Sequence, residues 1–230
     1  MGGVLMRNEA KVALRAVLLL AIAAGTGCTN IERSRNLADP AVPGKVLALQ
    51  VCSNCHGVDG NSESPNFPNL AAQTEPYFIE QLTSFRKHSR LDPAGFEYMW
   101  GLSRHLTDEQ IKEIAAYYAA QKVRRPDYPT GKANLRDTGK AVFAGGVQEK
   151  NIPPCATCHG PEGLGNAQFP RIAGQHADYV IKQLIVFQRT DERPEGAIMK
   201  VIAHDLTPDN IEAIASYLES LPVSQERIAR

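Results

Sequence analysis

The sequence has no excess of charge of one sign. Its 25 lysines and arginines balance 25 aspartates and glutamates, so the formal net charge is zero at pH 7. The basic side chains also form no stripe along the chain. Proteins that bind nucleic acid need clustered positive charge to replace the counterions of the phosphate backbone. We therefore expect no nucleic-acid partner.

Aromatic residues and strand-like patterns are also scarce. Aromatics make up 7% of the chain, and Trp100 is the sole tryptophan. A small domain buries little apolar surface by itself, so this composition predicts a thin protein core that a bound apolar group would complete. No segment alternates apolar and polar residues as a half-buried strand does. The fold class that we expect is all-α.

Long apolar runs are lacking, apart from one near the start of the chain. Residues 16–27, AVLLLAIAAGTG, are too few for a typical spanning helix and suit the apolar part of an export signal. The run ends at Cys28, where GTGC resembles the bacterial lipoprotein processing site, at which the cysteine is lipidated. We expect a periplasmic protein anchored to the membrane through Cys28. The alternatives are cleavage near Ala23, which leaves a free thiol, or a retained anchor segment.

Cysteine is rare, and four of the five cysteines belong to two short motifs. These are CSNCH at residues 52–56 and CATCH at residues 155–159. A Cys-x-x-Cys-His motif supplies two thiols for thioether bonds to haem vinyl groups and one imidazole for the iron. The sequence therefore predicts two covalently bound haem c groups. The residues expected to hold them are Cys52, Cys55, His56, Cys155, Cys158 and His159.

Two other kinds of site use similar motifs. A zinc site would need further soft ligands, but the remaining cysteine is Cys28, far upstream. A redox dithiol of the thioredoxin kind would need a βαβ pattern around it, and none is visible. Two copies of the motif in one chain favour haem attachment over either alternative.

The second half of the chain repeats the first. FPNLAAQTEPYFIEQLTSF at residues 67–85 aligns without a gap with FPRIAGQHADYVIKQLIVF at residues 169–187. Residues 99–119 align in the same way with residues 199–219. This pattern indicates a duplicated domain. The expected order is a signal segment (1–27), a tether (28–43), a first domain (44–122), a linker (123–138), a second domain (139–222) and a tail (223–230).

Helix signals recur in both halves. Thr107 and Gln110 predict a capping box, and Thr207 followed by Pro208 predicts a second helix start. Apolar residues then follow at helical spacing. The amphipathic helices expected from these signals close each domain. Further helices are expected at about residues 45–51, 75–87, 139–144 and 177–188.

Methionine is the second scarce residue with a regular placement. After the signal region the chain has only Met99 and Met199, which occupy equivalent places in the two repeats. A thioether ligand stabilises ferrous iron and raises its potential, so we expect both methionines to be the second axial ligands. The alternative for a methionine is core packing. The histidines outside the motifs share no register and are expected to be surface or local hydrogen-bonding residues; they are His88, His105, His176 and His204.

The order of these features resembles class I cytochromes c. That order is helix, Cys-x-x-Cys-His, proline-containing loop, helix, methionine and C-terminal helix. Two such units in tandem, with GGVQEKNIPPCATCHGPEGLGN at residues 145–166 and FPRIAGQ after it, resemble the dihaem cytochrome c4 type over about residues 44–221. The resemblance implies thioether links at the four motif cysteines and axial ligation by His56, Met99, His159 and Met199. It also implies that Pro68 and Pro170 offer their carbonyls to the ligand histidines.

The expected function is transfer of single electrons, with no catalytic residue. The resemblance implies transient redox partners, such as a quinol-oxidising donor complex and an acceptor that is a terminal oxidase or a reductase. One alternative is a dihaem enzyme, either a peroxidase or a sulfur-compound dehydrogenase, which would need an open or unusually ligated iron. The other is an electron-accepting subunit of a dehydrogenase complex.

Overall fold

The computed structural model describes residues 35–189 and 191–223. All regular elements in these ranges are helical, and the β-type pairings there are two isolated bridges, Val147 with Ile152 and Asn166 with Phe169. The prediction of an all-α fold is confirmed. The expected signal segment and Cys28 lie outside the described residues. Among the helices that are described, none combines the length and apolarity needed to cross a membrane.

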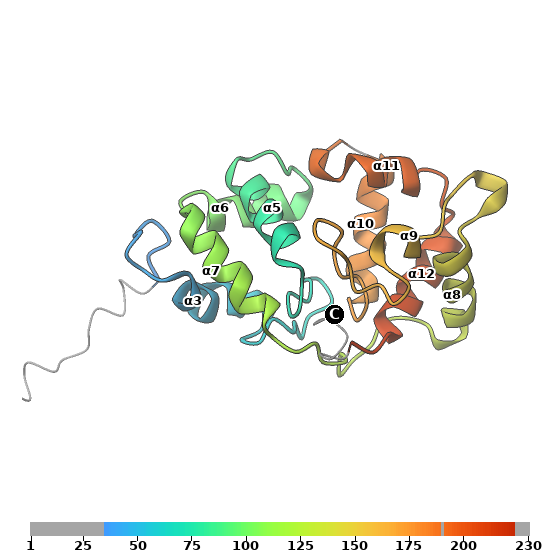
Figure 1. Ribbon diagram of the computed structural model, residues 1–230, viewed down its shortest axis with the longest axis horizontal. Coiled ribbons are helices and arrows are strands. Elements are labelled where there is room, and N and C mark those ends of the chain that lie inside the picture. The colour runs from blue at the N-terminus through green and yellow to red at the C-terminus, as the bar shows by residue number, and fades with distance from the viewer. Residues whose placement is uncertain (1–34, 190, 224–230) are drawn as a thin grey trace, which may run out of the picture. The chain divides into compact units, whose positions relative to one another are not determined.

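The helices fall into two consecutive sets, which we call the first and the second domain (Figure 1). The first domain contains α3 (Gly44–Leu47), the π-helical η1 (Ala48–Cys52), α4 (Ser53–His56), α5 (Glu75–Arg86), the π-helical η2 (Gly95–Met99), α6 (Trp100–Ser103) and α7 (Asp108–Ala119). The second contains the 3-10 helix η3 (Ala133–Leu135), α8 (Arg136–Gly145), η4 (Gln148–Lys150), α9 (Ala156–His159), α10 (Ala177–Arg189), η5 (Pro194–Gly196), α11 (Ala197–Ala203) and α12 (Pro208–Ser220).

The two closing helices begin as their sequences predict. The Thr107 hydroxyl accepts from the Gln110 amide at 3.1 Å, and the Gln110 side chain accepts from the Thr107 amide at 2.9 Å. Thr207 forms the same capping box with Asn210. Each box satisfies amides that a helix start leaves without partners. The apolar stripes that follow are buried in the domain cores, at Ile111, Ile114, Ala115, Tyr118, Ile211, Ile214, Ala215 and Leu218.

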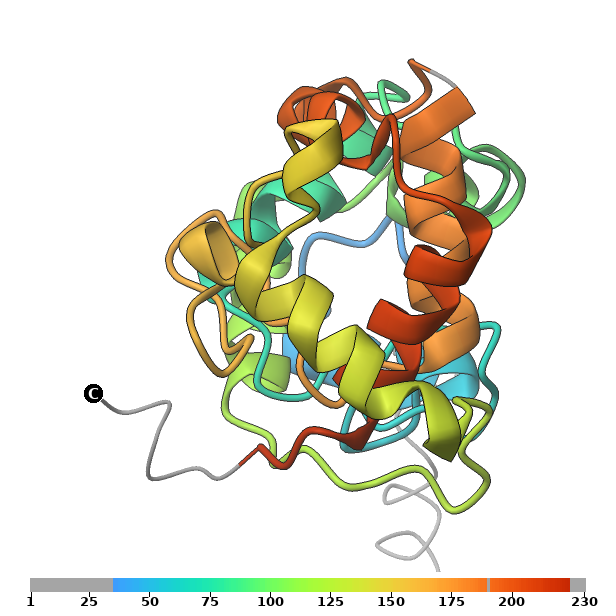
Figure 2. The same cartoon turned by 90° about the vertical axis from the view of Figure 1, so that its right-hand side faces the viewer.

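The first helix of each domain crosses the last one at a glycine. A β-carbon at Gly44 would lie 2.5 Å from the Gln110 carbonyl oxygen in α7. A β-carbon at Gly139 would collide with the Ala213 carbonyl in α12, which α8 crosses (Figure 2). Only glycine allows backbones to approach this closely. These two glycines therefore set how closely α3 packs on α7 and α8 on α12.

The predicted helices at 75–87 and 177–188 are close to α5 and α10. The helix predicted at 45–51 is longer, because α3 continues through η1 and α4 to His56, at the end of the first motif. The helix predicted at 139–144 lies within α8, which stops before its motif at Gly146, where φ is +72°. In the first domain the π turn η1 connects α3 to α4 without a break. In the second domain Gly146, in a conformation that other residues avoid, ends α8.

The contact between the domains is polar and nearly two-fold symmetric. Arg90 donates to Gln81 Oε1 (2.6 Å) in its own domain and to Gln183 Oε1 (3.3 Å) in the other. Arg193 mirrors it, donating to Gln183 Oε1 (2.6 Å) and Gln81 Oε1 (2.9 Å). Each arginine also pairs with the carboxylate two residues later, Asp92 or Glu195. Because these side chains are buried, their hydrogen bonds hold the two domains together in addition to apolar packing.

Candidate haem-binding sites

The first motif places its histidine inside the domain. His56 ends α4 and is 7% exposed. Its Nδ1 lies 3.0 Å from the Pro68 carbonyl oxygen. Because a carbonyl only accepts, Nδ1 carries the proton and Nε2 keeps its lone pair, which is the form that binds a metal. The chain leaves α4 through Gly57, whose φ of +76° turns it sharply toward the loop that carries Pro68.

The second motif repeats this geometry. His159 ends α9, is also 7% exposed, and its Nδ1 lies 2.9 Å from the Pro170 carbonyl oxygen. Gly160, with φ of +79°, takes the place of the glycine after the first motif. The prediction that Pro68 and Pro170 offer their carbonyls to the motif histidines is confirmed. Both imidazoles are therefore held in one tautomer and one orientation.

Burial also disfavours the charged forms of both motif histidines and of the first cysteine of each motif. Burial lowers the pKa of both motif histidines, although the proline carbonyls act in the opposite direction. It raises the pKa of the Cys52 thiol to about 11 and also raises the pKa of Cys155. None of the four motif cysteines forms a disulfide. Neutral imidazoles and free thiols are the forms that metal ligation and thioether formation require.

A phenylalanine ring lies edge-on to each motif histidine. The ring centroids of His56 and Phe67 are 6.1 Å apart with an interplanar angle of 66°, and those of His159 and Phe169 are 6.4 Å apart at 73°. No role for these phenylalanines was predicted from the sequence. Their common offset of 102 residues was the signal available, since it places both just before the loop proline.

The methionines lie against the same apolar cores as the motif cysteines. Met99 ends η2 and packs with Cys52 against the first core, which includes Leu47, Phe78, Leu82 and Ile114. Met199 lies in α11 and packs with Cys155 against the second core. Both methionines are half-buried. The structure thus brings each methionine to the domain of its own motif, and ligation by Met99 and Met199 stays a prediction.

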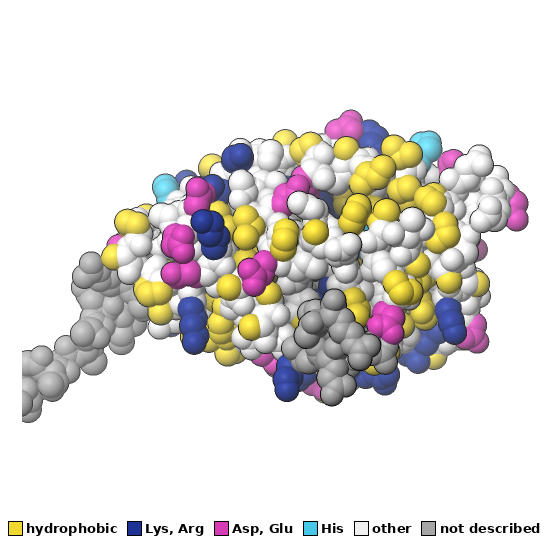
Figure 3. Space-filling view, in the orientation of Figure 1, with side chains coloured by type: hydrophobic (Ala, Val, Ile, Leu, Met, Phe, Trp, Pro, Cys, Tyr) yellow, Lys and Arg dark blue, Asp and Glu magenta, His cyan; other side chains and the backbone are white. Residues whose placement is uncertain are grey.

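The second domain presents an apolar face between its motif and its methionine. In the space-filling view, apolar side chains gather where α9, α10 and α11 lie, with few charges among them (Figures 1 and 3). Helix α11 also exposes Ile198 and Val201, the neighbours of Met199 in sequence. Two thiols, an imidazole with a free Nε2 and an adjoining apolar face fit a covalently attached porphyrin.

The other histidines divide into two groups. His105 and His204 are exposed, as expected, and His88 stacks between Phe96 (centroids 5.3 Å apart) and Trp100 (4.6 Å). His176 differs from its prediction, because it is buried and its Nε2 contacts the Ser62 carbonyl of the other domain at 2.9 Å. Only the tertiary contact between domains could reveal that partner.

A zinc site has no ligand set in the part of the chain that is described. Within it, no three or more histidine, cysteine and acidic side chains come together as metal ligands. The two motifs therefore act in separate domains, each with its own histidine. This arrangement agrees with haem attachment and not with a shared zinc ion.

Comparison with known proteins gives the same result. A family model described as "Cytochrome c" matches residues 41–121 and again residues 137–222. A cytochrome c4 of Pseudomonas aeruginosa is 38% identical over 208 residues, which cover 89% of this chain and 98% of that protein. A thiosulfate dehydrogenase electron acceptor of Stutzerimonas stutzeri (strain A1501) is 33% identical, covering 76% of this chain and 80% of that protein.

The solved structures agree with the sequence comparison. The crystal structure of reduced recombinant cytochrome c4 from Pseudomonas stutzeri matches with a TM-score of 0.67 at 37% identity, covering 80% of this chain and 99% of that one. The two tandem matches to the family model and the nearly full-length relatives assign the chain to a family. The chain belongs to the cytochrome c family, among the dihaem electron-transfer proteins of the cytochrome c4 type, and it carries two covalently bound haem c groups.

Proposed function

We propose that each domain holds its haem through the two motif cysteines and binds the iron with one histidine and one methionine. The ligand pairs are His56 with Met99 and His159 with Met199. The observation that carries this proposal is the repeated hydrogen bond from the motif histidine to the loop proline, at 3.0 and 2.9 Å. In both domains this bond leaves the lone pair of Nε2 free to bind iron. Each domain also has one methionine thioether packed against its own core.

The protein residues then do the work of a carrier rather than of an enzyme. When bound, the haem iron supplies a centre that alternates between the ferric and ferrous states. The proline carbonyls hold the imidazoles in place, the methionine thioethers would bind the iron and exclude small molecules from it, and the apolar cores would keep water away. Closed coordination and fixed ligands favour passage of single electrons over substrate turnover.

The partners that we propose are redox proteins bound transiently. The donor would be a respiratory complex that oxidises quinol, and the acceptor a terminal oxidase or a reductase. Interfaces of electron-transfer partners are small. The apolar side chains exposed beside the methionines, Phe96 and Tyr98 in η2 and Ile198 and Val201 in α11, are the surface that we propose for such contacts.

The ligand assignment is tested with methionine variants. Met99→Ala and Met199→Ala should each remove half of the sulfur-to-iron absorption band of the oxidised protein and lower the potential of one haem. His204→Ala, which changes an exposed histidine, serves as the control and should change neither. An unaltered protein that shows no such band at one haem, and turns over peroxide or thiosulfate, would refute the proposal.

A second candidate is an electron acceptor dedicated to a sulfur-oxidising dehydrogenase. It is favoured by the relative that bears the name thiosulfate dehydrogenase electron acceptor. The oxidised protein would be mixed with thiosulfate, with and without a thiosulfate dehydrogenase. Reduction that needs the dehydrogenase supports the acceptor function, reduction by thiosulfate alone supports an enzyme, and no reduction leaves the respiratory carrier.

We also propose a periplasmic location with a lipid anchor at Cys28. Support comes from the charged stretch that ends at Arg15, the apolar run at 16–27 and the cysteine that follows. Several acyl chains on one cysteine would hold the protein at a membrane. Cys28→Ala should move the protein from the membrane to the soluble periplasmic fraction, and an intact mass would detect the lipid. An unlipidated mature protein starting near residue 24 would contradict the anchor.

A further inference from the structure

One peptide group in the first domain connects its motif histidine to the second domain. The carbonyl of Pro68 accepts from His56 Nδ1 at 3.0 Å. The amide N–H of the same peptide unit belongs to Asn69, and it donates to the Gln175 side-chain oxygen at 2.8 Å. Gln175 comes from the second domain, just before α10. The two bonds therefore run in series from Gln175 through one peptide group to His56.

The second domain repeats this series of hydrogen bonds, with the roles of the two domains exchanged. The Pro170 carbonyl accepts from His159 Nδ1 at 2.9 Å, and the amide of Arg171, in the same peptide unit, donates to Gln73 Oε1 at 2.7 Å. Gln73 belongs to the first domain, just before α5. Each domain thus contributes a glutamine to the histidine of the other.

Both glutamines are fixed rigidly at this contact. Gln175 Nε2 donates to the Asn69 carbonyl at 3.2 Å, and Gln73 Nε2 donates to the Arg171 carbonyl at 3.1 Å. Each side-chain amide therefore pairs with both the N–H and the C=O of one residue across the boundary. The exposed fractions of Gln73 and Gln175 are 7% and 4%, so water does not compete for these bonds.

Hydrogen bonds that share a peptide group reinforce each other. When its N–H donates to an oxygen, the peptide group is polarised and its carbonyl becomes a stronger acceptor. A stronger acceptor at Nδ1 makes the imidazole a more basic ligand, which favours ferric iron and lowers the potential. The identity of the residue at 73 or 175 therefore bears on the iron of the opposite domain.

We propose that Gln73 and Gln175 are positioning residues that act crosswise. Gln175 sets the hydrogen-bond strength at His56 and so the potential of the first haem, and Gln73 does the same at His159 for the second haem. This inference rests on the proposed histidine ligation and adds to it a control exerted by each domain on the other's redox centre.

The test compares the potentials of the two haems in the full haem-loaded protein. Gln175→Leu removes the acceptor for the Asn69 amide and should raise the potential of the first haem, leaving the second nearly unchanged. Gln73→Leu should do the reverse. Outer-shell partners of metal ligands have effects of about tenfold or more. For a bond one step further away we expect about threefold in the reduction equilibrium, equal to ~28 mV at 59 mV per tenfold for one electron.

A matched control separates this effect from loosening of the domain contact. Gln183 is also a buried glutamine of the second domain that bonds across the boundary, to Arg90. It has no link to the Pro68 peptide group among the hydrogen bonds of the described residues. Gln183→Leu should therefore weaken the domain contact without raising the first haem's potential selectively.

Two further measurements cover variants that fail to fold. Gln175→Glu keeps the acceptor oxygen, so the potential of the first haem should not rise. In the unaltered ferrous protein, NMR should detect a coupling through the hydrogen bond between the Asn69 amide nitrogen and the Gln175 side-chain carbonyl carbon. The His56 Nδ1–H resonance should then move upfield in Gln175→Leu, because its hydrogen bond weakens.

The outcomes discriminate clearly. Crossed shifts, with each glutamine moving the opposite haem, support the proposal. Shifts confined to the mutated domain, equal shifts of both haems, no shift, or the same pattern in Gln183→Leu overturn it. If both haems keep their sulfur-to-iron bands while the shifts are not crossed, only this inference fails. Absence of histidine–methionine ligation in the unaltered protein would defeat the proposed function and this inference together.

Discussion

The two domains carry the same site but reach it by different routes. In the first, α3, η1 and α4 form one helical path from Gly44 to His56. In the second, α8 ends at Gly145, and a loop stabilised by the Val147–Ile152 bridge precedes α9. Ile152 from that loop is buried in the second core. The approach to the motif can therefore change while the position of its histidine is kept.

What stays the same in both domains lies after the motif. Each motif is followed by a glycine with positive φ, each histidine bonds to a loop proline, and each loop proline is followed by an amide that bonds to the other domain. The feature that both domains keep is therefore the orientation of the imidazole. The chain that leads to the motif differs, although the first helix of each domain packs closely on the closing helix.

The largest expected effect concerns the paired arginines between the domains. Arg90 and Asp92 are almost fully buried, with side-chain exposures of 4% and 0%, whereas Glu195, the partner of Arg193, is 8% exposed. Removing one member of a buried ion pair costs about 3–5 kcal/mol, because the other charge stays buried. Arg90→Leu should lower the free energy of unfolding by about this amount, and Arg193→Leu by less. Urea denaturation of the haem-loaded proteins measures both, and an equal loss would contradict the asymmetry.

The same pair predicts a dependence on pH. Burial alone would raise the pKa of Asp92, but the neighbouring Arg90 guanidinium holds it below its ordinary value. This contribution to stability is therefore present above the ordinary carboxylate value, near ~3.9, and is lost as the pH falls through the folded pKa. In Arg90→Leu the strongest opposition to burial is lost and the weaker Arg193 and Lys182 charges remain, so that variant should gain stability as the pH falls from neutral toward 4. A loss of stability over the same range, followed by the urea midpoint, would contradict this sign.

The next effect concerns the glycines at the helix crossings. Gly139 lies inside α8, where a β-carbon would collide with the Ala213 carbonyl and approach the Tyr217 β-carbon at 2.8 Å. Gly44 is the first residue of α3, where the chain has more freedom to shift. Overpacking costs about 1–3 kcal/mol. Gly139→Ala should be near the upper end and Gly44→Ala near the lower, as measured by thermal unfolding; Gly145→Ala, where nothing approaches, is the control.

A smaller effect tests the continuous helix of the first domain. The buried Tyr118 hydroxyl donates to the Ala48 carbonyl in η1 at 3.1 Å, and the second domain has Leu218 at the equivalent place. Loss of a buried hydrogen bond costs about 1 kcal/mol, so Tyr118→Phe should destabilise the protein by that amount. Tyr117→Phe removes the bond to the Val58 carbonyl from a more exposed hydroxyl and should cost less in the same urea titration. Equal costs would remove the special role of Tyr118.

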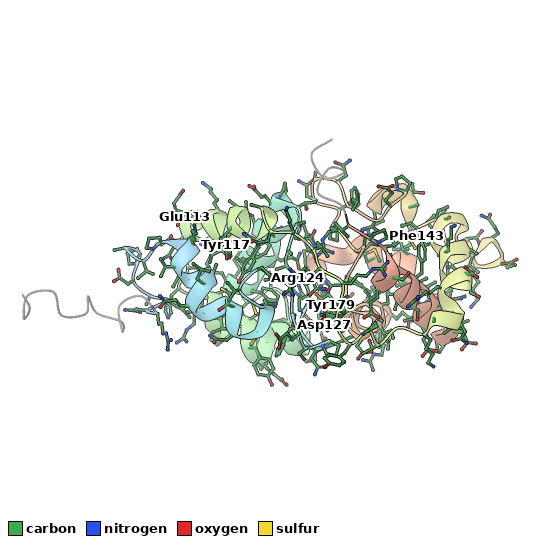
Figure 4. The ribbon with its side chains drawn as sticks, turned by 90° about the horizontal axis from the view of Figure 1, so that it is seen from below. Glu113, Tyr117, Arg124, Asp127, Phe143 and Tyr179 are labelled. Atoms are coloured by element: carbon green, nitrogen blue, oxygen red, sulfur yellow. The ribbon has the colours of Figure 1, made fainter. Side chains whose placement is uncertain are left out.

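The smallest effect concerns the start of the linker. Arg124 pairs with Asp59 at 2.9 Å, but their side chains are 60% and 38% exposed, and Figure 4 shows Arg124 near the junction of the domains. Exposed pairs contribute less than about 1 kcal/mol and are screened by salt. Arg124→Ala should therefore lower stability only slightly at low salt and not at high salt. A large loss that persists at high salt would show that this pair holds the linker.

Much of this architecture was predictable from residues that repeat. The two motifs, the paired methionines, the Thr107 capping box and the helix start at Thr207 each rest on local chemistry or on spacing along one helix, so their positions could be read from the chain. The second capping box, between Thr207 and Asn210, was not predicted. The boundaries of α5 and α10 followed within a few residues for the same reason. The π turn that extends the first helix was missed, because sequence spacing does not distinguish it from an ordinary helix end.

The sequence by itself determined the covalently bound haem c and the tandem repeat, because covalent attachment depends on residues that are neighbours in the chain. The tertiary structure alone decided which groups act across the boundary. Gln73 and Gln175 lie about 100 residues from the peptide groups that they bind, and Arg90 and Arg193 meet the glutamines of the opposite domain. Such contacts depend on how two folded surfaces meet, and no local pattern in the chain encodes that meeting.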